Sequence, residues 1–409
     1  MIVTNNPSKP IKICMIVQQV YDQDPRVIRY TKALINHGAQ VDVLSVQGKE
    51  KIDCHRGNGL NVYTIPLSHT SQSLPAYLFE YFLAMLFFSF KLFFLHIKNH
   101  YDIIHVHNMP DFLIFSALIP RILGAKLILD IHDPMPEFYQ AKFKKSAKHP
   151  LVPIMTLQEK ISASLAHAVL TANPTFKENL IQRGIPAEKI TVTQNLPDKN
   201  IFERGKFKRE RDSAERFTLL YPGTIAPRYG LDTAVRSLLL LIPVIPGIRL
   251  RIIGKDNNHT QQLKKLAAEL NVGTYVEFIP RLPTEKIPQE MSQADIGIYP
   301  ALPDPHMSIA MPGKVLEFAT MGLPTITSRL QVLEKVFSDM AVRYVSPGQP
   351  EEFAQAVLDL YQHPEKLAAL IQHADQEFVQ IQSWEHERQK YFDVIAKLLN
   401  KEQPFQTQP

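Results

Sequence analysis

Cysteine and tryptophan are scarce in this chain of 409 residues, which contains two cysteines and one tryptophan. Neither the number nor the spacing of Cys14 and Cys54 supports a disulfide framework or a cysteine-based metal site. Cys14 lies within an apolar, strand-like segment, so we expect a buried thiol there. The low cysteine content predicts a reducing, cytoplasmic compartment.

Other features are also missing. The N-terminal residues MIVTNNPSKP lack the apolar core of a signal peptide, which agrees with a cytoplasmic location. The sequence has no dense block of Arg and Lys with interleaved aromatic residues, so a nucleic acid is not an expected partner. The formal net charge of +5 fits an anionic substrate or an anionic membrane surface.

The chain is too long for one hydrophobic core and predicts two domains. Apolar strand-like segments alternate with helical segments throughout, which indicates the α/β class and two consecutive Rossmann-like domains. We place an N-terminal domain at 1–197, a charged linker at 198–216, a C-terminal domain at 217–382 and a final helix at 383–400. The linker is assigned from its basic run GKFKRERD, a composition typical of a solvated loop.

The first strand, loop, helix and strand resemble the opening of a doubly wound sheet. The loop QQVYDQDPR lacks the G-x-G-x-x-G fingerprint, which argues against a dinucleotide-binding dehydrogenase. Asp24 precedes Pro25 at the predicted start of a helix, so we interpret Asp24 as its N-cap.

Ionisable side chains follow two strands of the predicted N-terminal sheet. The strand YDIIHVH ends in His105, His107 and Asn108, and the strand KLILDI is followed by His132 and Asp133. In open α/β sheets, ligands bind outside the carboxyl ends of the strands. These residues therefore predict a functional edge of the N-terminal domain.

The segment 77–97, YLFEYFLAMLFFSFKLFFLHI, is rich in phenylalanine. Polar residues interrupt it, so no run reaches the roughly 18–20 apolar residues of a membrane-spanning helix. A long helix buried against the sheet, a helix at a membrane interface and a spanning helix all remain open. An interfacial position predicts peripheral contact with an anionic membrane.

The stretch 311–324, MPGKVLEFATMGLP, has the signals of one helix: Pro312 near its first turn and Gly322 just after its end. Lys314 and Glu317 lie three residues apart and can share a face. A helix N-terminus suits a phosphate, and a carboxylate one turn further in suits vicinal hydroxyls. A nucleotide sugar carries both groups; a surface helix with an ordinary Lys/Glu pair is the alternative.

Further candidate residues follow strands of the C-terminal domain. Arg228 lies in the loop after the first strand, and with Lys314 it can neutralise a diphosphate. Small or basic residues end two of the strands and complete the expected donor side, namely Gly223, Thr224, Gly254 and Lys255.

Several stretches, weak when taken singly, are specific as a set. They are DPRVIRYTKALINHGAQVDVLS, YDIIHVHNMPD, LILDIHD, YPGTIAPRYGLDTAV, PGKVLEFATMGLPTI and SWEHERQKYFDVI. The chain resembles the GT-B glycosyltransferases of family 4, the retaining group that includes glycogen synthase and phosphatidylinositol mannosyltransferases. The resemblance implies two Rossmann-like domains facing across a cleft, with the last helix returning to the N-terminal domain.

The resemblance also implies roles for single residues. Glu317 matches the second glutamate of the family's paired motif, which binds the ribose, whereas Ile309 stands in the place of the first. Thr224 and Tyr229 replace the usual Arg and Lys of the phosphate loop, and Arg228 lies between them. His132 matches the histidine near the transferred sugar.

We therefore expect catalytic roles for His132, Asp133 and Arg228. The donor, a UDP-, GDP- or ADP-linked sugar, is expected to contact Gly313, and backbone amides near Ala310 and Met311 are expected to serve its sugar. The acceptor, a glycan or a lipid-linked molecule, is expected at Asp24, Arg26, His107, Asn108 and Glu137.

The family resemblance implies retention of the anomeric configuration, with the leaving diphosphate accepting the acceptor's proton. Asp22 and Asp24 spell the D-x-D of metal-dependent transferases, but the N-cap interpretation and the GT-B resemblance both predict no metal or cofactor. Two other functions stay open: a nucleotide-sugar epimerase of the same fold, and a catalytically silent subunit that scaffolds a membrane polysaccharide complex. The missing acid at Ile309 favours the silent subunit. The four retained residues favour catalysis, namely Lys314, Glu317, Arg228 and His132.

Overall fold

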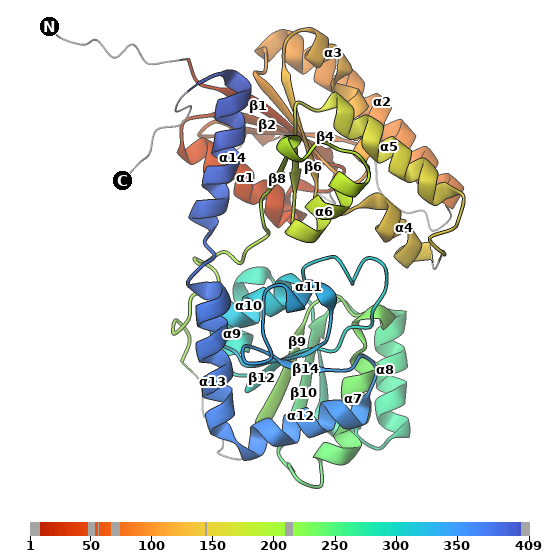
Figure 1. Ribbon diagram of the computed structural model, residues 1–409, viewed down its shortest axis with the longest axis vertical. Helices are drawn as coiled ribbons and strands as arrows, with labels where there is room; N and C mark the ends of the chain where they lie inside the picture. Colours follow the sequence, from red (N-terminus) through yellow and green to blue (C-terminus); the bar gives the residue numbers. More distant parts are fainter. Residues whose placement is uncertain are drawn as a thin grey trace, which may run out of the picture. The chain divides into compact units, whose positions relative to one another are not determined.

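The computed structural model describes residues 9–47, 54–55, 57–66, 74–143, 145–208 and 216–401. The chain divides into two compact units, shown in Figure 1. Unit 1 comprises residues 1–194 and 385–409, and unit 2 comprises residues 195–384. Each unit is an α/β domain built on one sheet, so the predicted fold class of two Rossmann-like domains is confirmed.

Unit 1 contains an eight-stranded sheet in the order β3-β4-β2-β1-β5-β6-β7-β8. The pairs are parallel except for β3 with β4. The short β3 and β4 were not predicted, because β4 is only partly buried and lacks a continuous apolar run. The strands are β1 (Lys12–Ile16), β2 (Gln40–Val46), β3 (Cys54–His55), β4 (Leu60–Ile65), β5 (Ile103–His107), β6 (Lys126–Ile131), β7 (Ala168–Thr171) and β8 (Ile190–Val192).

Helices cover both faces of this sheet (Figure 1). Successive side chains of β5 point to opposite faces of the sheet. Ile104 and Val106 pack in a core shared with α2, whereas His105 and His107 lie on the face covered by α1 and α14. The helices of unit 1 are α1 (Pro25–Asn36), α2 (Leu74–Asn99), α3 (Leu118–Ile122), α4 (Met135–Phe143), α5 (Leu151–Leu165), α6 (Pro174–Gln182) and α14 (Trp384–Leu399), with the 3₁₀ segment η2 (Asp111–Ala117).

Two expectations for unit 1 are confirmed, the N-cap at Asp24 and the buried thiol of Cys14, and one helix was not predicted. The N-cap prediction for Asp24 is confirmed, because its carboxylate accepts hydrogen bonds from the backbone N–H groups of Arg26 and Val27. The helix α4 was not predicted, since Pro134 and Pro136 at its start are more typical of a loop. Cys14 is a buried free thiol, as expected.

Unit 2 contains a six-stranded parallel sheet in the order β11-β10-β9-β12-β13-β14. Its strands are β9 (Phe217–Pro222), β10 (Ile248–Gly254), β11 (Val276–Pro280), β12 (Ile296–Tyr299), β13 (Thr325–Ser328) and β14 (Arg343–Val345). Its helices are α7 (Leu231–Leu241), α8 (Asn258–Glu269), α9 (Ile287–Ser292), α10 (Gly313–Met321), α11 (Gln331–Glu334), α12 (Pro350–Gln362) and α13 (Pro364–Ala374), with the 3₁₀ turn η4 (Pro227–Tyr229).

The helix α10 begins and ends where its sequence signals predict. It starts after Pro312 and stops at Gly322, whose positive φ of 68° suits a residue without a Cβ. Gly297 of β12 lets α10 lie directly on the sheet, because a Cβ there would fall 2.7 Å from the ring of Phe318. A glycine in the sheet thus fixes the position of the helix that carries Lys314 and Glu317.

The predicted linker at 198–216 needs a correction. As far as the structure describes it, through residue 208, this segment belongs to unit 2. Phe202 is buried in a cluster with Leu220 and Phe318. Arg204 donates to the carbonyl oxygen of Ala319 at 2.9 Å and forms an ion pair with Asp375. The prediction of a solvated linker rested on the basic run GKFKRERD. The contacts with unit 2 come from Phe202 and Arg204, which directly precede that run.

Candidate functional site

The carboxyl ends of β9 and β10 meet at glycines. A Cβ on Gly254 would lie 2.3 Å from the carbonyl oxygen of Gly223, so the two strand ends approach more closely than a side chain at residue 254 would allow. A Cβ on Gly223 would lie 1.8 Å from Cε of Lys314. The side chain of Lys314 therefore crosses from α10 over Gly223, and these two strand ends and α10 form one site in unit 2.

Aromatic rings surround the ammonium of Lys314. Its Nζ lies 5.9 Å from the ring centroid of Tyr221 and 5.7 Å from that of Tyr229, within cation–π range. The rings of Tyr229 and Tyr299 are 6.1 Å apart. Burial lowers the pKa of Lys314, and the carboxylate of Glu317 acts in the opposite direction. An incoming anion would favour the charged form of this lysine.

Tyr229 lies beside Lys314. The resemblance places a lysine at residue 229, on the loop after β9. Here Tyr229 ends η4, and the ammonium of Lys314 lies against its ring. The α10 helix thus supplies a positive charge next to the position where the resemblance expects the lysine. Thr224 on the same loop uses its carbonyl oxygen to accept the hydroxyl of Tyr221 at 2.7 Å.

Arg228 is engaged with a carboxylate. Its Nε donates to Oδ2 of Asp304 at 2.9 Å, and Nη2 contacts the same oxygen. The other oxygen of Asp304 accepts the backbone N–H groups of His306 at 2.9 Å and Met307 at 2.7 Å. The carbonyl of Arg228 also accepts the N–H of Leu302 at 2.8 Å. Arg228 is therefore tied to the loop after β12, which carries Ile309, Ala310 and Met311.

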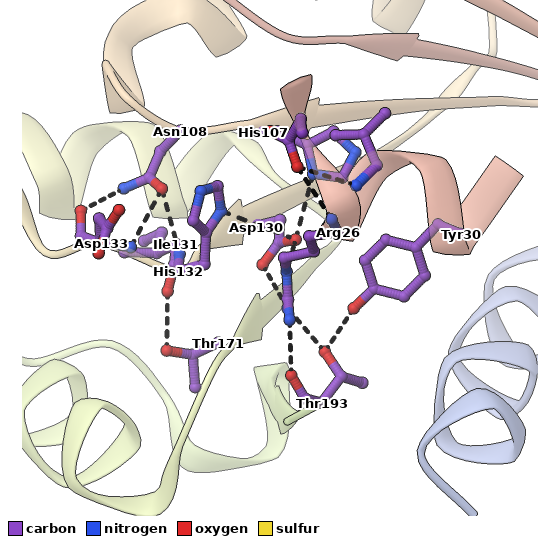
Figure 2. A network of polar contacts seen from close by, with 12 residues as sticks. Arg26, Tyr30, His107, Asn108, Asp130, Ile131, His132, Asp133, Thr171 and Thr193 are labelled. Carbon is purple, nitrogen blue, oxygen red and sulfur yellow. Dashed lines mark hydrogen bonds and ion pairs between the residues drawn. The ribbon is translucent and has the colours of Figure 1, made fainter. Parts of the chain in front are cut away.

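In unit 1, a buried carboxylate lies at the centre of the polar contacts drawn in Figure 2. Asp130 of β6 accepts two hydrogen bonds from Arg26, at 2.7 and 2.9 Å. Nδ1 of His107 lies 3.2 Å from the same carboxylate. Burial alone would raise the pKa of Asp130, but Arg26 and His107 hold that pKa well below its usual range. Asp130 is therefore ionised and matched by the cation beside it.

The network extends from Arg26 to the end of β8 and to α14. Arg26 donates to the carbonyl oxygen of Thr193 at 2.8 Å and to its hydroxyl at 2.9 Å, and the hydroxyl also contacts Tyr30 at 2.7 Å (Figure 2). His105 lies 3.0 Å from the hydroxyl of Tyr391 on α14. Burial lowers the pKa values of His105 and His107, so both are neutral at pH 7.

Asn108 joins the ends of β5 and β6. Its side-chain oxygen accepts the backbone N–H of His132 at 3.1 Å, and its amide donates to the carbonyl oxygen of Asp133 at 2.6 Å (Figure 2). His132 lies 3.9 Å from the carboxylate of Asp130 and keeps 16% of its side chain exposed. Among the labelled residues of this network, His132 thus combines an ionisable ring with access to solvent.

Comparison with known proteins assigns the chain to a family. Residues 26–199 match the family model "Glycosyltransferase Family 4", and residues 203–377 match "Glycosyl transferases group 1". The chain belongs to the GT-B glycosyltransferases of family 4. It is a glycosyltransferase, and the expectation of a transferase is confirmed.

Individual relatives of this glycosyltransferase are distant in sequence. The chitobiosyldiphosphodolichol beta-mannosyltransferase of Kluyveromyces lactis is 22% identical over 356 residues, covering 80% of this chain and 78% of that protein. Sucrose-phosphate synthase from Thermosynechococcus elongatus has a similar structure, with a TM-score of 0.77 at 17% identity over 95% of this chain and 99% of that one. Anabaena HepE in complex with UDP has a TM-score of 0.69 at 15% identity, over 95% and 100% of the two chains. These structural likenesses show the fold.

The glycosyltransferase brings the predicted residues together as two groups, one in each unit. In unit 2, Gly223, Gly254 and Lys314 meet at one sheet edge, and Glu317 lies one turn beyond Lys314 on α10. In unit 1, His107, Asn108, His132 and Asp133 meet at the ends of β5 and β6. Lys255, exposed after β10, uses its carbonyl oxygen to accept the side chain of Asn257 at 3.3 Å.

Two further residues predicted on the acceptor side also have structural partners. Arg26 is buried and bound to Asp130, so its guanidinium supports the site from within the protein. Glu137 forms an ion pair with Arg183, which also binds Glu159 at 3.0 Å. Their roles toward an acceptor remain predictions.

The sequence analysis placed His105 at this strand end but missed four members of the unit 1 network: Tyr30, Asp130, Thr193 and Tyr391. A signal for one of them was present. Asp130 interrupts the apolar run LILDI, and a polar residue inside a buried strand needs a partner. Tyr30, Thr193 and Tyr391 carry no such signal, because only the fold brings them to Arg26 and His105.

His105, His107 and Asp130 offer ligand atoms within 4.8 Å of one another, which is a spacing compatible with a metal ion. However, the guanidinium of Arg26 already binds both oxygens of Asp130. A cation placed there would face that positive charge in a buried setting. The group is therefore unsuited to a metal, and the expected independence from metals and cofactors stays a prediction.

Proposed function

We propose that this glycosyltransferase moves a sugar from a nucleotide diphosphate sugar to a glycan or lipid-linked acceptor, with retention of anomeric configuration, in polysaccharide or glycolipid biosynthesis. One observation carries the donor assignment. Lys314 and Glu317 lie on α10, and the side chain of Lys314 lies over the glycine Gly223 at the end of β9. This arrangement offers positive charge, close backbone approach and a carboxylate within one helical turn.

Each part of the donor has a matching group in unit 2. The N-terminus of α10 starts at Gly313 without a side-chain cap and suits a phosphate oxygen, and Lys314 adds a full charge. Glu317, one turn further, suits the hydroxyls of a ribose. The lysine contributes most when charge builds on the leaving nucleoside diphosphate. HepE, a structural neighbour, is described in complex with UDP, which supports a nucleotide as ligand.

The sugar end of the donor is proposed to lie near the loop after β12. Ile309 offers no acid there, so backbone N–H groups near Ala310 and Met311 would serve the sugar hydroxyls. Asp304 is the carboxylate of this loop, and it holds Arg228 in place. We propose that Arg228 contacts the diphosphate while it stays bound to Asp304. The carboxylate of Asp304 would then orient the guanidinium toward one oxygen of the diphosphate.

The acceptor is assigned to unit 1, near His132 and Asp133. Of the carboxylates near His132, Asp130 is buried beneath Arg26 and Glu137 is paired with Arg183, which argues against these two as covalent nucleophiles. The proposal keeps the front-face reaction that the family resemblance implies, in which the leaving diphosphate accepts the acceptor's proton. The related K. lactis protein is named a beta-mannosyltransferase, so the anomeric configuration of the product is a necessary measurement.

A cytoplasmic location is part of the proposal. The buried free thiol of Cys14 suits a reducing compartment.

The decisive experiment is a calorimetric panel of UDP-, GDP- and ADP-sugars against wild type, Glu317→Ala and the control Glu334→Ala. Glu334 is an exposed acid on α11, paired with Arg329. Loss of a charge-assisted hydrogen bond predicts about 10- to 100-fold weaker binding for Glu317→Ala and unchanged binding for the control. NMR of the anomeric proton of the product then reports retention.

Several outcomes would contradict the proposal. If no nucleotide sugar binds the wild type, the donor assignment is wrong and a scaffold function gains support. If a UDP-sugar is epimerised without an acceptor, the transfer assignment is wrong. An inverted product would retain the donor assignment and overturn the front-face reaction.

A further inference from the structure

The helix α2 has two apolar faces with different surroundings. One face is buried in the core of unit 1, and it consists of Tyr81, Ala84, Phe88, Leu92 and Leu95. The opposite face is exposed, and it consists of Phe79, Phe82, Leu86, Phe87, Phe90, Phe94 and Ile97. By length and composition, Phe79–Asn99 could cross a membrane. Crossing would pull the first face out of the core, so the packing favours a helix that lies along a surface.

Two more helices extend this exposed face. Both α2 and α5 pack against η2, and α3 packs against α2 and η2. Figure 1 shows α2, α3 and α5 in the same part of unit 1. Most of the exposed large apolar side chains in the described residues lie on these three helices. In addition to those of α2, they are Leu118, Ile119, Ile122 and Leu123 on or beside α3, and Ile154, Leu157 and Ile161 on α5. Ile122 reaches 81% exposure and Phe90 68%. We name these side chains together the apolar surface.

The exposed charges at the α4–α5 end of the apolar surface are basic. Lys142, Lys145, Lys148 and Lys160 are exposed at the end of α4, in the loop to α5 and on α5. The acid of α5, Glu159, is buried and bound to Arg183. An open groove of about 580 Å³ lies at the start of α5 and is lined by Ala147, Lys148, Val152, Pro153, Thr156, Leu157 and Lys160. The groove combines apolar walls with two ammonium groups.

We propose that the apolar surface docks onto an anionic lipid bilayer, with α2 parallel to the membrane plane. The phenylalanines would enter the boundary between headgroups and acyl chains, as the apolar face of an interfacial helix does. The lysines at the α4–α5 loop would meet lipid phosphates, and the groove between Lys148 and Lys160 fits one headgroup. This inference goes beyond the proposed function, because it concerns a surface distinct from the donor and acceptor residues.

Charge distinguishes this occupant from others. An anionic bilayer offers charge opposite to these lysines over a wide, flat area, and each basic residue near such a surface strengthens binding. A second copy of the chain would present the same apolar and basic side chains and would supply no anionic phosphates to them. Exposed apolar area of this extent is also uncommon on a monomeric protein without a partner.

The test is flotation of the full chain with vesicles of phosphatidylglycerol and phosphatidylcholine, compared with phosphatidylcholine alone. Wild type should float with the anionic vesicles and dissociate as salt rises. Phe90→Asp should lower the bound fraction about tenfold or more, and so should Lys145→Glu combined with Lys148→Glu. The matched control is Ile381→Asp, which changes an apolar residue of unit 2 that is 64% exposed and should leave flotation unchanged.

Absence of wild-type flotation with either vesicle overturns the proposal, and so does equal flotation of wild type and Phe90→Asp. A concentration-dependent dimer that Phe90→Asp dissociates, without vesicle binding, would assign the surface to a second copy. Circular dichroism confirms that each variant is folded. All variants should bind nucleotide sugar as wild type does, so failure here is separate from failure of the proposed function.

Discussion

The two groups of predicted residues differ in how they use charge. In unit 1, the carboxylate below the strand ends is buried and already matched by a cation, with Asp130 bound by Arg26 and His107. In unit 2, Lys314 lies among aromatic rings over a glycine, and burial lowers its pKa. The charge of Asp130 is balanced without a ligand, whereas the charge of Lys314 would gain stability from an anion.

This difference suggests that the buried residues of unit 1 stabilise the fold and that the residues of unit 2 bind the donor. Buried ion pairs hold a site in shape but offer little to a substrate, since their hydrogen bonds are already made. Lys314 has given up water for an aromatic setting, and burial lowers its pKa despite the opposing charge of Glu317, so a phosphate can bind it strongly. We therefore expect substitutions in unit 1 to change stability first, and substitutions in unit 2 to change donor affinity first.

The largest expected effect is on stability, from Arg26→Met. This change leaves the carboxylate of Asp130 buried without its cation, which costs about 3–5 kcal/mol of unfolding free energy. Urea denaturation measures the loss. The control is Lys366→Met, which breaks the exposed pair with Asp359 and should cost less than about 1 kcal/mol. Equal costs for the two variants would show that the buried network does not support unit 1.

The next effect is on donor affinity, from Lys314→Met. Methionine keeps the apolar stem and removes the charge, so nucleotide binding should weaken by about 1.5–3 kcal/mol with little change in melting temperature. Calorimetry against the free nucleoside diphosphate measures it. For wild type, binding should weaken as pH rises through the lowered pKa of Lys314, because deprotonation removes the charge. The variant should lack that pH dependence.

Gly223→Ala tests the role of Lys314 in a second way. Its Cβ would lie 1.8 Å from Cε of Lys314, so the lysine must move. In the double variant with Lys314→Met, the effects on affinity should be far from additive. Additive losses would mean that Gly223 acts on the donor without Lys314, and the proposed contact would be wrong.

The smallest expected effect concerns a buried acid in unit 1. Burial and the neighbouring carboxylate of Glu159 raise the pKa of Asp111. The folded state therefore binds this proton more tightly than the unfolded state, so its contribution to stability falls as pH rises above the unfolded pKa. Asp111→Asn should flatten this decline between pH 5 and pH 8, measured by urea denaturation at several pH values. A steeper decline in the variant would contradict the sign.

Much of the fold could be predicted from local patterns. The apolar strands, the proline and glycine at the ends of α10, and the cap at Asp24 are encoded within a few residues of each element. The partly buried β4 and the proline-rich start of α4 were missed, because their local signals are weak. The linker at 198–216 was wrong through residue 208, because Arg204 finds its partners far along the chain.

The sequence by itself predicted the main residues of the candidate site: Lys314 and Glu317 on one helix face, and His132 with Asp133 after a strand. The tertiary structure alone decided what surrounds them. Arg26 meets Asp130 across 104 positions of the chain, and the side chain of Lys314 crosses over Gly223. The physical reason is range, since caps and periodicity act between near neighbours, whereas burial and charge pairing depend on residues that only folding brings together.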